Sequence, residues 1–521
     1  MSPFSTPAHD AAIEQIRQVV AQGPYLPDWD SLRQYGFPKW YQDGKFGIFI
    51  HWGPSSTSGF QADWYAREMY RQGRPEFDYH RKTFGPQDQF GYKDLIPNFT
   101  MENFDPDQWA SLFRRAGAQF VVPLAEYHDG FAEYDSAFTP WKATEMGPKR
   151  DLLGDLFQSL RKVGITPGCS SHYAENWWFF NGGVKFPSDV QDPAFAALYG
   201  PAQREEISPN DEWMRHWLCR TCDFVDKYRP ALVWFDGCFN GIEQPGYAPW
   251  LKLFAAYYFN RATEWGVHVA LNYKNFSFPD DVGVRDFERG QLSDIHHPFW
   301  QTDTSLARNT WIHIPDAVYK EAGTVIGDLV DIVSKNGALL LNIGPRPDGS
   351  IPEAELALLE EIGNWLSVHG EAIYRTRPWK IYGEGPSKIE EGHFSDTHRA
   401  PYTAADIRFT QRVPERIHDD ILYATVMARP TDGQVLIKCL AAGSGLLLQN
   451  IMRIDLLGGA RALLWERTPN GLSVTLPRDL PGKHALVLRI YLEPKANNRR
   501  LNVPTAEDGP DYFHPTTSHK D

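Results

Sequence analysis

The sequence predicts an α/β fold: a (β/α)8-like TIM barrel followed by a C-terminal antiparallel β-sandwich. Two observations support this prediction. Before residue 385, compact apolar segments alternate with amphipathic segments of helical periodicity, which indicates a parallel sheet covered by helices on both faces. Beyond that point, short strand-like runs are separated by Gly, Pro and Asp turns, as in antiparallel sandwiches. With 521 residues, 42% of them hydrophobic, the chain is long enough for more than one domain.

The pattern begins after an N-terminal leader. Residues 1–40 predict a leader that contains one short helix, and residues 46–50 predict the first strand. A helix is expected from Asp105 onward, because Asp is a favourable N-cap and Pro106 occupies the first helical position, where proline is favoured. A buried strand at residues 120–125 follows this helix.

The same strand and helix unit recurs farther along the chain. A helix with apolar positions from Leu153 to Leu160 leads to a strand that begins at Ile165, and a long helix starts at Asp211. The later strands are short apolar runs followed by polar residues, and they are predicted at residues 231–234, 268–271 and 337–341.

Polar side chains directly follow these predicted strands. In barrels of this kind the active site gathers at the C-terminal ends of the strands. One polar residue after a strand is ordinary, but His and Asp residues at several successive strand ends are not. We therefore interpret these residues as a functional site: His51, His128, His172, Asp236 and Asn272.

The chain divides into three predicted parts. Residues 1–384 are expected to form the catalytic barrel with its leader, and residues 385–492 the sandwich. Residues 493–521 are polar and rich in Pro, Asn and Asp, which predicts a flexible tail.

Composition excludes several classes of partner. The chain has 52 Lys and Arg residues and 66 Asp and Glu residues, so its formal net charge is −14, and no basic run stands out. Nucleic acid and anionic membranes are therefore not expected as partners. No apolar run is long enough to span a bilayer, and the N-terminus lacks an apolar signal core, so we expect a cytoplasmic protein. A periplasmic or secreted protein whose signal had been removed would look the same.

The cysteines and histidines do not predict a metal site. Five cysteines are a sparse, odd set that argues against a disulfide framework. Cys219 and Cys222 form a CxxC pair, but they lie in a predicted helix and no second pair follows at zinc-site spacing. His296 and His297 precede a proline and are interpreted as a surface loop, and the first strand offers only His51. We expect no metal and no cofactor, and a metal-dependent hydrolase is the alternative.

Two carboxyl groups are the minimum for retaining hydrolysis of a glycosidic bond, because one attacks the anomeric carbon and the other protonates the leaving oxygen. Asp236 follows the apolar run Ala-Leu-Val-Trp-Phe, where a charged side chain is costly without a purpose or a partner, so it is the candidate nucleophile. Spacing does not choose its partner among four other acids: Glu126, Glu175, Asp286 and Glu288.

Taken together, these residues resemble the α-L-fucosidases of glycoside hydrolase family 29. The similarity includes Phe-Gly-Ile-Phe-Ile-His-Trp-Gly at residues 46–53, Tyr-His-Asp-Gly-Phe at 127–131 and Trp-Phe-Asp-Gly at 234–237. It continues in Gly-Pro-Lys-Arg-Asp-Leu at 147–152 and Leu-Asn-Ile-Gly-Pro at 341–345. So many motifs in the same order make the resemblance specific, and it extends over residues 35–492.

The resemblance implies a retaining exo-α-L-fucosidase without cofactor, which removes terminal fucosyl units from a glycan. It implies Asp236 as nucleophile and, in the segment Asp-Phe-Glu-Arg-Gly, Glu288 as acid/base, with Glu175 in reserve. The residues expected to bind the sugar are His51, Asp63, Trp64, Tyr127, His128, His172, Trp234 and Lys274.

Three of these positions depart from the family pattern. Tyr127 stands where His is usual, Asp63 where Glu is usual, and Lys274 where Arg is common. Each substitution keeps a polar donor or acceptor but changes its reach. We therefore expect a fucose pocket with altered contacts to the ring or to the next sugar.

Two alternatives to a fucosidase stay open. One is a fucose-binding protein without catalysis, and the other is a hydrolase for a related sugar such as L-galactose. Fucose lacks a 6-hydroxyl, so a fucose pocket should have an apolar wall there, which the sequence does not identify. Homo-oligomer formation also stays open, as does the role of the sandwich, where bracing the barrel is more usual than binding sugar.

Overall fold

The computed structural model describes residues 2–60, 63–237, 246–397, 400–413, 420–459 and 462–494. Cys238 and residues 495–521 of the predicted tail lie outside these residues. No helix in the described part of the chain is both long and apolar enough to cross a membrane.

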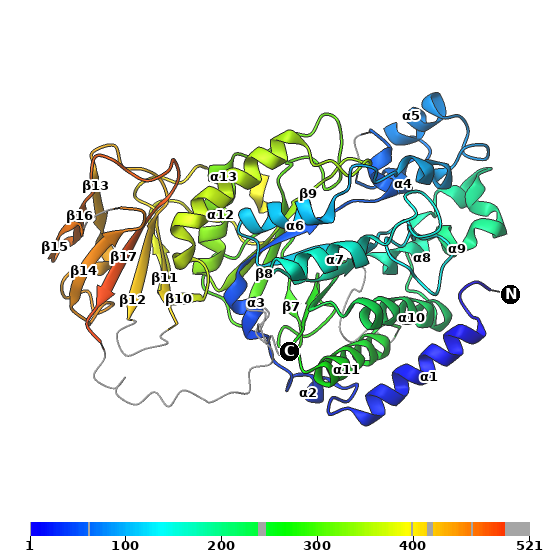
Figure 1. Ribbon diagram of the computed structural model, residues 1–521, viewed down its shortest axis with the longest axis horizontal. Coiled ribbons are helices and arrows are strands. Elements are labelled where there is room, and N and C mark those ends of the chain that lie inside the picture. Colours follow the sequence, from blue (N-terminus) through cyan, green and yellow to red (C-terminus); the bar gives the residue numbers. More distant parts are fainter. Residues whose placement is uncertain are drawn as a thin grey trace, which may run out of the picture.

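A parallel barrel forms the centre of the molecule (Figure 1). Within the described residues its strands run in the order β7-β6-β5-β4-β2-β1-β9-β8, and β3 also pairs with β2. A parallel bridge between Asp286 and Gln301 joins the two ends of this sheet. The strands are β1 (Phe46–Ile50), β2 (Phe120–Glu126), β3 (Thr166–Pro167), β4 (Cys169–Ser171), β5 (Leu232–Phe235), β6 (Ala270–Tyr273), β7 (Val284–Arg285), β8 (Trp300–Ser305) and β9 (Gly337–Ile343).

Side chains alternate along each strand between the barrel interior and the surrounding helices. Phe49 of β1 packs inside the barrel against Trp234 of β5, whereas Ile48 and Ile50 belong to the core between barrel and helices. Asp236 follows Trp234 by two residues, so it has the same inward direction and lies at the mouth of the barrel. The strands therefore aim the residues at their ends into one place.

Helices cover the outside of the barrel, as predicted. The side chain of Asp105 accepts hydrogen bonds from the backbone N–H groups of Asp107 and Gln108, and it caps α6 as expected. The leader differs from the prediction, because α1 is a long helix of 16 residues that packs against α10 and α11 (Figure 1). The helices are α1 (Pro7–Gln22), α2 (Trp29–Leu32), α3 (Lys39–Gly44), α4 (Tyr65–Glu68), α5 (Pro75–Thr83), α6 (Pro106–Arg115), α7 (Leu152–Lys162), α8 (Asn176–Phe179), α9 (Ala196–Tyr199), α10 (Asp211–Tyr228), α11 (Ala248–Trp265), α12 (Ala322–Ser334) and α13 (Glu353–His369).

The predicted strands of the barrel are all present, with small shifts at their ends, but β7 and β8 were not predicted. β7 has only two residues. β8 reads Trp-Gln-Thr-Asp-Thr-Ser, which lacks an apolar run, yet all six residues are buried. Its polar side chains are buried because they contribute to a polar network under the mouth of the barrel.

Two antiparallel sheets follow the barrel and enclose a second hydrophobic core. One sheet has the order β10-β11-β12-β17-β14 and the other β13-β16-β15. β10 lies before residue 385, so this sheet takes in residues on the barrel side of the expected boundary. The strands are β10 (Thr376–Glu384), β11 (Ile407–Arg412), β12 (Ile421–Val426), β13 (Gln434–Ile437), β14 (Ile451–Leu456), β15 (Leu464–Thr468), β16 (Gly471–Thr475) and β17 (Leu486–Leu492).

The C-terminal sheets pack beside α12, on the left in Figure 1. A buried ion pair joins Arg408 of β11 to Asp331 of α12, and Lys335 contacts the other carboxylate oxygen of Asp331 at 2.6 Å. The two parts of the molecule therefore share a polar interface as well as apolar contacts.

The CxxC pair lies in a helix, as predicted. Cys219 and Cys222 are buried in α10. Among the described cysteines, all are free thiols: Cys169, Cys219, Cys222 and Cys439.

Candidate active site

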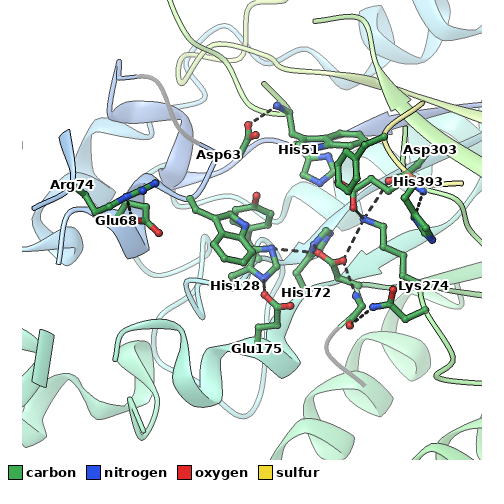
Figure 2. A pocket seen from close by; sticks show the side chains of 18 residues that line it. His51, Asp63, Glu68, Arg74, His128, His172, Glu175, Lys274, Asp303 and His393 are labelled. Atoms are coloured by element: carbon green, nitrogen blue, oxygen red, sulfur yellow. Dashed lines mark hydrogen bonds and ion pairs between the residues drawn. The ribbon is translucent and has the colours of Figure 1, made fainter. Parts of the chain in front are cut away.

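A cavity of about 640 Å³ opens at the C-terminal ends of the barrel strands. The strand ends of β1, β2, β4, β5, β6 and β7 each contribute a polar side chain to its wall (Figure 2). In strand order these side chains are His51, His128, His172, Asp236, Lys274 and Glu288.

Asp236 is held on both carboxylate oxygens. His172 Nδ1 donates to its Oδ2 at 2.8 Å, and His128 Nε2 lies 3.4 Å from the same atom. The Gly237 N–H donates to Oδ1 at 2.7 Å, and Lys274 Nζ lies 3.4 Å from it. Burial alone would raise the pKa of Asp236, but Lys274 and the two histidines hold that pKa well below its ordinary value. Asp236 is therefore ionised, the state that a nucleophile needs.

Lys274 joins three carboxyl groups. Its Nζ lies 2.9 Å from Glu288 Oε2, 3.4 Å from Asp236 Oδ1 and 3.6 Å from Asp303 Oδ2. Burial opposes the charge of Lys274, but the neighbouring carboxylates raise its pKa well above the ordinary value. One buried ammonium group thus offsets the repulsion between carboxyl groups that would otherwise not stay together.

Glu288 differs from Asp236 in protonation, because its pKa is raised and not lowered. Burial raises the pKa of Glu288, Asp303 and Asp236 raise it further, and Lys274 only partly opposes them. Because Lys274 Nζ contacts one oxygen of each, those oxygens of Asp236 and Glu288 are separated by no more than the sum of 2.9 and 3.4 Å. The site therefore pairs an ionised carboxylate with a nearby carboxyl group that retains its proton at higher pH.

Two of the other candidate acids lie outside the cavity. Glu126 is fully buried in an ion pair with Arg220 at 2.8 Å, which leaves it without access to a ligand. Asp286 is fully buried beneath the cavity, where its Oδ2 accepts a hydrogen bond from Trp234 Nε1 at 2.9 Å. Both carboxylates have structural partners.

Glu175 does line the cavity, but behind a histidine. Its Oε2 lies 3.0 Å from His128 Nδ1, while His128 Nε2 faces Asp236 (Figure 2). The imidazole ring thus separates Glu175 from Asp236, whereas Glu288 and Asp236 contact the same ammonium group of Lys274. The geometry favours Glu288 over Glu175 as the partner of Asp236.

His128 and His172 differ in charge although both contact Asp236. Burial lowers the pKa of His172 to about 4 despite the opposing effect of Asp236, so this ring is neutral and donates through Nδ1. Burial also lowers the pKa of His128, but its ion pairs with Glu175 and Asp236 outweigh burial and raise the pKa overall. His128 is therefore the more readily protonated ring.

His51 and Asp63 are fixed by residues from other strands and loops. His51 Nδ1 donates to the Asn342 amide oxygen at 2.7 Å, which leaves its Nε2 as an acceptor. Asp63 accepts hydrogen bonds from the Thr310 hydroxyl at 2.8 Å and from the backbone N–H of Trp311. Asp63 thereby holds the loop that places the Trp311 indole in the cavity wall.

The three remaining predicted sugar contacts divide into two groups. Trp64 and Tyr127 line the cavity, and Trp64 is 37% exposed at its mouth. Trp234 is not among the lining residues. It is fully buried, its ring lies 4.9 Å from Lys274 Nζ, and its indole N–H donates to Asp286. Trp234 therefore supports the cavity from below.

Several lining residues have no strand-end signal in the sequence. Asp303 belongs to the polar strand β8, and His393 and Phe394 come from the segment between β10 and β11. Arg74 and Glu68 form an ion pair at 2.6 Å on the side of the cavity opposite His393 (Figure 2). Identification of β8 would have revealed Asp303, but no local pattern points to the other four.

A metal ion is a second possible occupant of one corner of the site. His128, His172 and Asp236 each offer one ligand atom within 4.8 Å of the others. However, these atoms already contact one another, and the Lys274 ammonium lies 3.4 Å from Asp236. A fixed positive charge at the same carboxylate disfavours a second cation.

Comparison with known proteins identifies the family. The family model described as alpha-L-fucosidase matches residues 12–371, and the model of the alpha-L-fucosidase C-terminal domain matches residues 401–491. The chain belongs to the α-L-fucosidase family. It is thus a glycoside hydrolase, and the resemblance found in the sequence is confirmed.

Curated α-L-fucosidases and solved structures agree with this assignment. The tissue alpha-L-fucosidase of Homo sapiens is 30% identical over 394 residues, which cover 72% of this chain and 77% of the human protein. The Rattus norvegicus enzyme is 28% identical over 483 residues, covering 88% and 90% of the two chains. The crystal structure of Thermotoga maritima alpha-fucosidase matches with a TM-score of 0.70 at 28% identity, over 89% of this chain and 100% of that chain. The predicted barrel and sandwich are confirmed.

Proposed function

We propose that this α-L-fucosidase family member is a retaining exo-enzyme that removes terminal α-L-fucosyl units from glycans. The observation that carries the proposal is the pair Asp236 and Glu288, bridged by Lys274. Their bridged oxygens are closer than the roughly 6.5–9.5 Å between the carboxyl groups of inverting glycosidases, and retaining enzymes have about 5–5.5 Å. This short separation supports the retaining reaction over the inverting one.

In the first step an oxygen of Asp236 attacks the anomeric carbon of the fucosyl unit. The bond from this carbon to the leaving oxygen breaks, and the leaving oxygen takes the proton of the Glu288 carboxyl group. The products are a fucosyl ester on Asp236 and a released alcohol or sugar. Lys274 stays close to both carboxylates and balances the charge that moves from one to the other.

In the second step Glu288, now a carboxylate, removes a proton from a water molecule. The water oxygen attacks the anomeric carbon, the ester bond breaks, and Asp236 leaves as a carboxylate. Two inversions give net retention. The raised pKa of Glu288 suits this exchange of roles, because the same group must hold a proton in one step and accept one in the next.

The cavity offers a match to fucose in particular. Neutral His51 presents its Nε2 as an acceptor, which suits a ring hydroxyl. Trp311 stands in the wall beside His51, with ring centroids 5.3 Å apart. We assign it as the apolar wall that would contact the methyl group of fucose and disfavour the 6-hydroxyl of L-galactose.

An assay of the purified protein tests this function. We expect release of fucose from p-nitrophenyl α-L-fucoside or from fucosylated oligosaccharides, with the α-anomer appearing first in the ¹H NMR spectrum. Faster hydrolysis of the matched L-galactoside would contradict the assignment of Trp311. Fucose binding without turnover of any substrate would favour a non-catalytic binding protein instead.

A further inference from the structure

The loop that carries Glu288 is held by a segment from the C-terminal part of the chain. This segment, residues 392–396, lies between β10 and β11, and we call it the returning segment. The Glu288 N–H donates to His393 Nδ1 at 3.1 Å, and the Phe394 N–H donates to the Glu288 carbonyl oxygen at 2.8 Å. Both backbone polar groups of Glu288 are therefore fixed by two consecutive residues of the returning segment.

Further backbone contacts extend this pairing on both sides. The Gly392 N–H donates to the Gln291 carbonyl oxygen at 3.1 Å, and the Asp396 N–H donates to the Arg289 carbonyl oxygen at 2.9 Å. The loop after β7 thus gains neighbours through the returning segment that the barrel does not supply. The barrel holds the same loop from β8, where the Arg289 N–H donates to the Asp303 carbonyl oxygen at 2.8 Å, and the returning segment completes the support of residues 288–291.

The far end of the returning segment is anchored in the barrel by a buried ion pair. Asp396 Oδ2 lies 2.6 Å from Lys320 Nζ and accepts a hydrogen bond from the Thr304 hydroxyl of β8 at 2.8 Å. The side chains of Asp396 and Lys320 are each 2% exposed. A buried pair of this kind fixes the position of the segment, because either charge alone would be costly in the interior.

Two side chains of the returning segment face the cavity beside Glu288. His393 and Phe394 both line it, and Figure 2 places His393 next to Lys274 and Asp303. Phe394 is 57% exposed, although aromatic side chains of its size are usually buried. A general acid must lie next to the leaving oxygen, so the cavity wall beside Glu288 is the place for a leaving group.

We propose that the returning segment forms the subsite for the leaving sugar and positions the general acid. Phe394 is the aromatic surface on which the apolar face of the leaving sugar packs, and His393 is a positioning residue that holds Glu288 through its backbone N–H. This inference rests on the proposed function, with Glu288 as the acid. It gives the C-terminal sheets a role in substrate choice beyond bracing the barrel.

Two substrates separate the roles of the returning segment from the rest of catalysis. α-L-Fucosyl fluoride carries no leaving sugar, and fluoride departs with little help from an acid. A fucosylated oligosaccharide, chosen as the one that the wild-type enzyme cleaves fastest, needs both the acid and the leaving-group subsite. Each variant is measured on both substrates, so the fluoride activity of the same preparation reports the folded enzyme.

For Phe394→Ala we expect KM for the oligosaccharide to rise about three- to tenfold, while fluoride hydrolysis is unchanged. For His393→Ala we expect kcat for the oligosaccharide to fall about 10- to 100-fold, with a much smaller effect on the fluoride. His393→Asn keeps an acceptor for the Glu288 N–H and should restore most of this kcat. Met452→Ala is the matched control, because Met452 is an exposed apolar residue of β14 in the sheet that contains β10 and β11.

Different outcomes contradict the proposed function and the inference about the returning segment. A wild-type enzyme that cleaves neither substrate contradicts the proposed function. If the wild type cleaves both substrates, the inference is overturned when Phe394→Ala and His393→Ala lose equal activity on both substrates or lose none. The proposed function would then still stand. A wild type that hydrolyses the fluoride but no oligosaccharide also overturns it, because a built leaving-sugar subsite would then have no use. Failure of His393→Asn to restore kcat removes the positioning role of His393.

Discussion

At the scale of single residues, Lys274 lets two carboxyl groups of different protonation stand side by side. It lowers the pKa of Asp236 and does not prevent burial and neighbouring carboxylates from raising the pKa of Glu288. The two groups are therefore pushed apart in pKa by their surroundings, as expected for a nucleophile and an acid.

These opposite shifts predict the pH dependence of kcat/KM. Activity requires ionised Asp236, so it is lost only as pH falls through a pKa below the ordinary 3.8. It also requires protonated Glu288, so it is lost as pH rises through a pKa above the ordinary 4.5. We expect Glu288→Ala to remove this alkaline limb and to lower kcat about 10²- to 10⁴-fold on substrates that need an acid.

Added azide provides a second check on Glu288. A small anion can occupy the space left in Glu288→Ala and attack the fucosyl ester, which should give fucosyl azide and restore turnover of p-nitrophenyl α-L-fucoside. Full activity of Glu288→Ala without azide would contradict the role of Glu288 and return Glu175 to consideration.

The cluster of His128, His172 and Asp236 leads to a prediction about metals. Because Lys274 already supplies the positive charge at Asp236, we expect kcat to be unchanged after prolonged treatment with EDTA and desalting. Metal content can be measured on the same sample. Loss of activity that returns on addition of one divalent metal would show that these three residues act as ligands.

The sequence predicted those site residues that follow apolar strands directly. His51, His172 and Asp236 were found in this way, because parallel strands end at the same mouth of the barrel. The choice of Glu288 came from family resemblance, since the acids differ only in their three-dimensional surroundings. His393 could not be predicted at all, because its proximity to Glu288 depends on a chain reversal about a hundred residues away in sequence.

At the scale of elements, helix α10 fixes the loop that carries Tyr127 and His128. Arg220 of α10 pairs with Glu126 at the end of β2 at 2.8 Å and donates to the Gly130 carbonyl oxygen at 3.2 Å. Both side chains are fully buried. The loop between Glu126 and Gly130 is thus held at its two ends by one guanidinium group.

Arg220→Ala should therefore destabilise the protein and disturb the site together. Removal of one partner of a buried ion pair costs about 3–5 kcal/mol, which urea or thermal unfolding can measure. Arg215→Ala is the matched control, because Arg215 lies on the same helix but pairs with the exposed Asp10. Equal stability of the two variants would contradict a structural role for the Arg220 pair.

Elements with an apolar pattern were predicted from the sequence, and those without one were not. β1 and β9 are apolar runs buried on both faces, and the sequence predicted both as strands. β8 is equally buried, but its Gln301, Thr302 and Asp303 belong to the polar network under the cavity, so its composition is that of a loop. A strand whose own side chains form the polar network is therefore harder to predict than one that carries a site residue only at its end.

At the scale of the whole molecule, the barrel and the C-terminal sheets are joined by polar groups that have no solvent around them. Arg408 of β11 and Asp331 of α12 are 2% and 0% exposed in their side chains. The change in composition near residue 385 indicated the second domain. It did not reveal this interface, because Arg408 and Asp331 are 77 residues apart in the sequence and meet only in the folded molecule.

Loss of this ion pair should weaken the joint between the two parts. We expect Arg408→Ala to cost about 3–5 kcal/mol and to lower the temperature of the unfolding transition. Calorimetry would also show whether the C-terminal sheets then unfold separately from the barrel. Arg453→Ala, which removes an arginine whose side chain is 57% exposed on the same sheet, should have little effect. Equal melting curves for both variants would contradict the importance of the interface.

The central claim, that Asp236 forms a covalent fucosyl ester, is tested most directly by trapping that ester. A 2-deoxy-2-fluoro fucosyl fluoride should inactivate the enzyme, because the fluorine slows the second step more than the first. Intact mass and peptide mapping should then show one 2-fluorofucosyl unit on the peptide that contains Asp236. A label on Glu175 or Glu288, or no label on an enzyme that hydrolyses p-nitrophenyl α-L-fucoside, would contradict it.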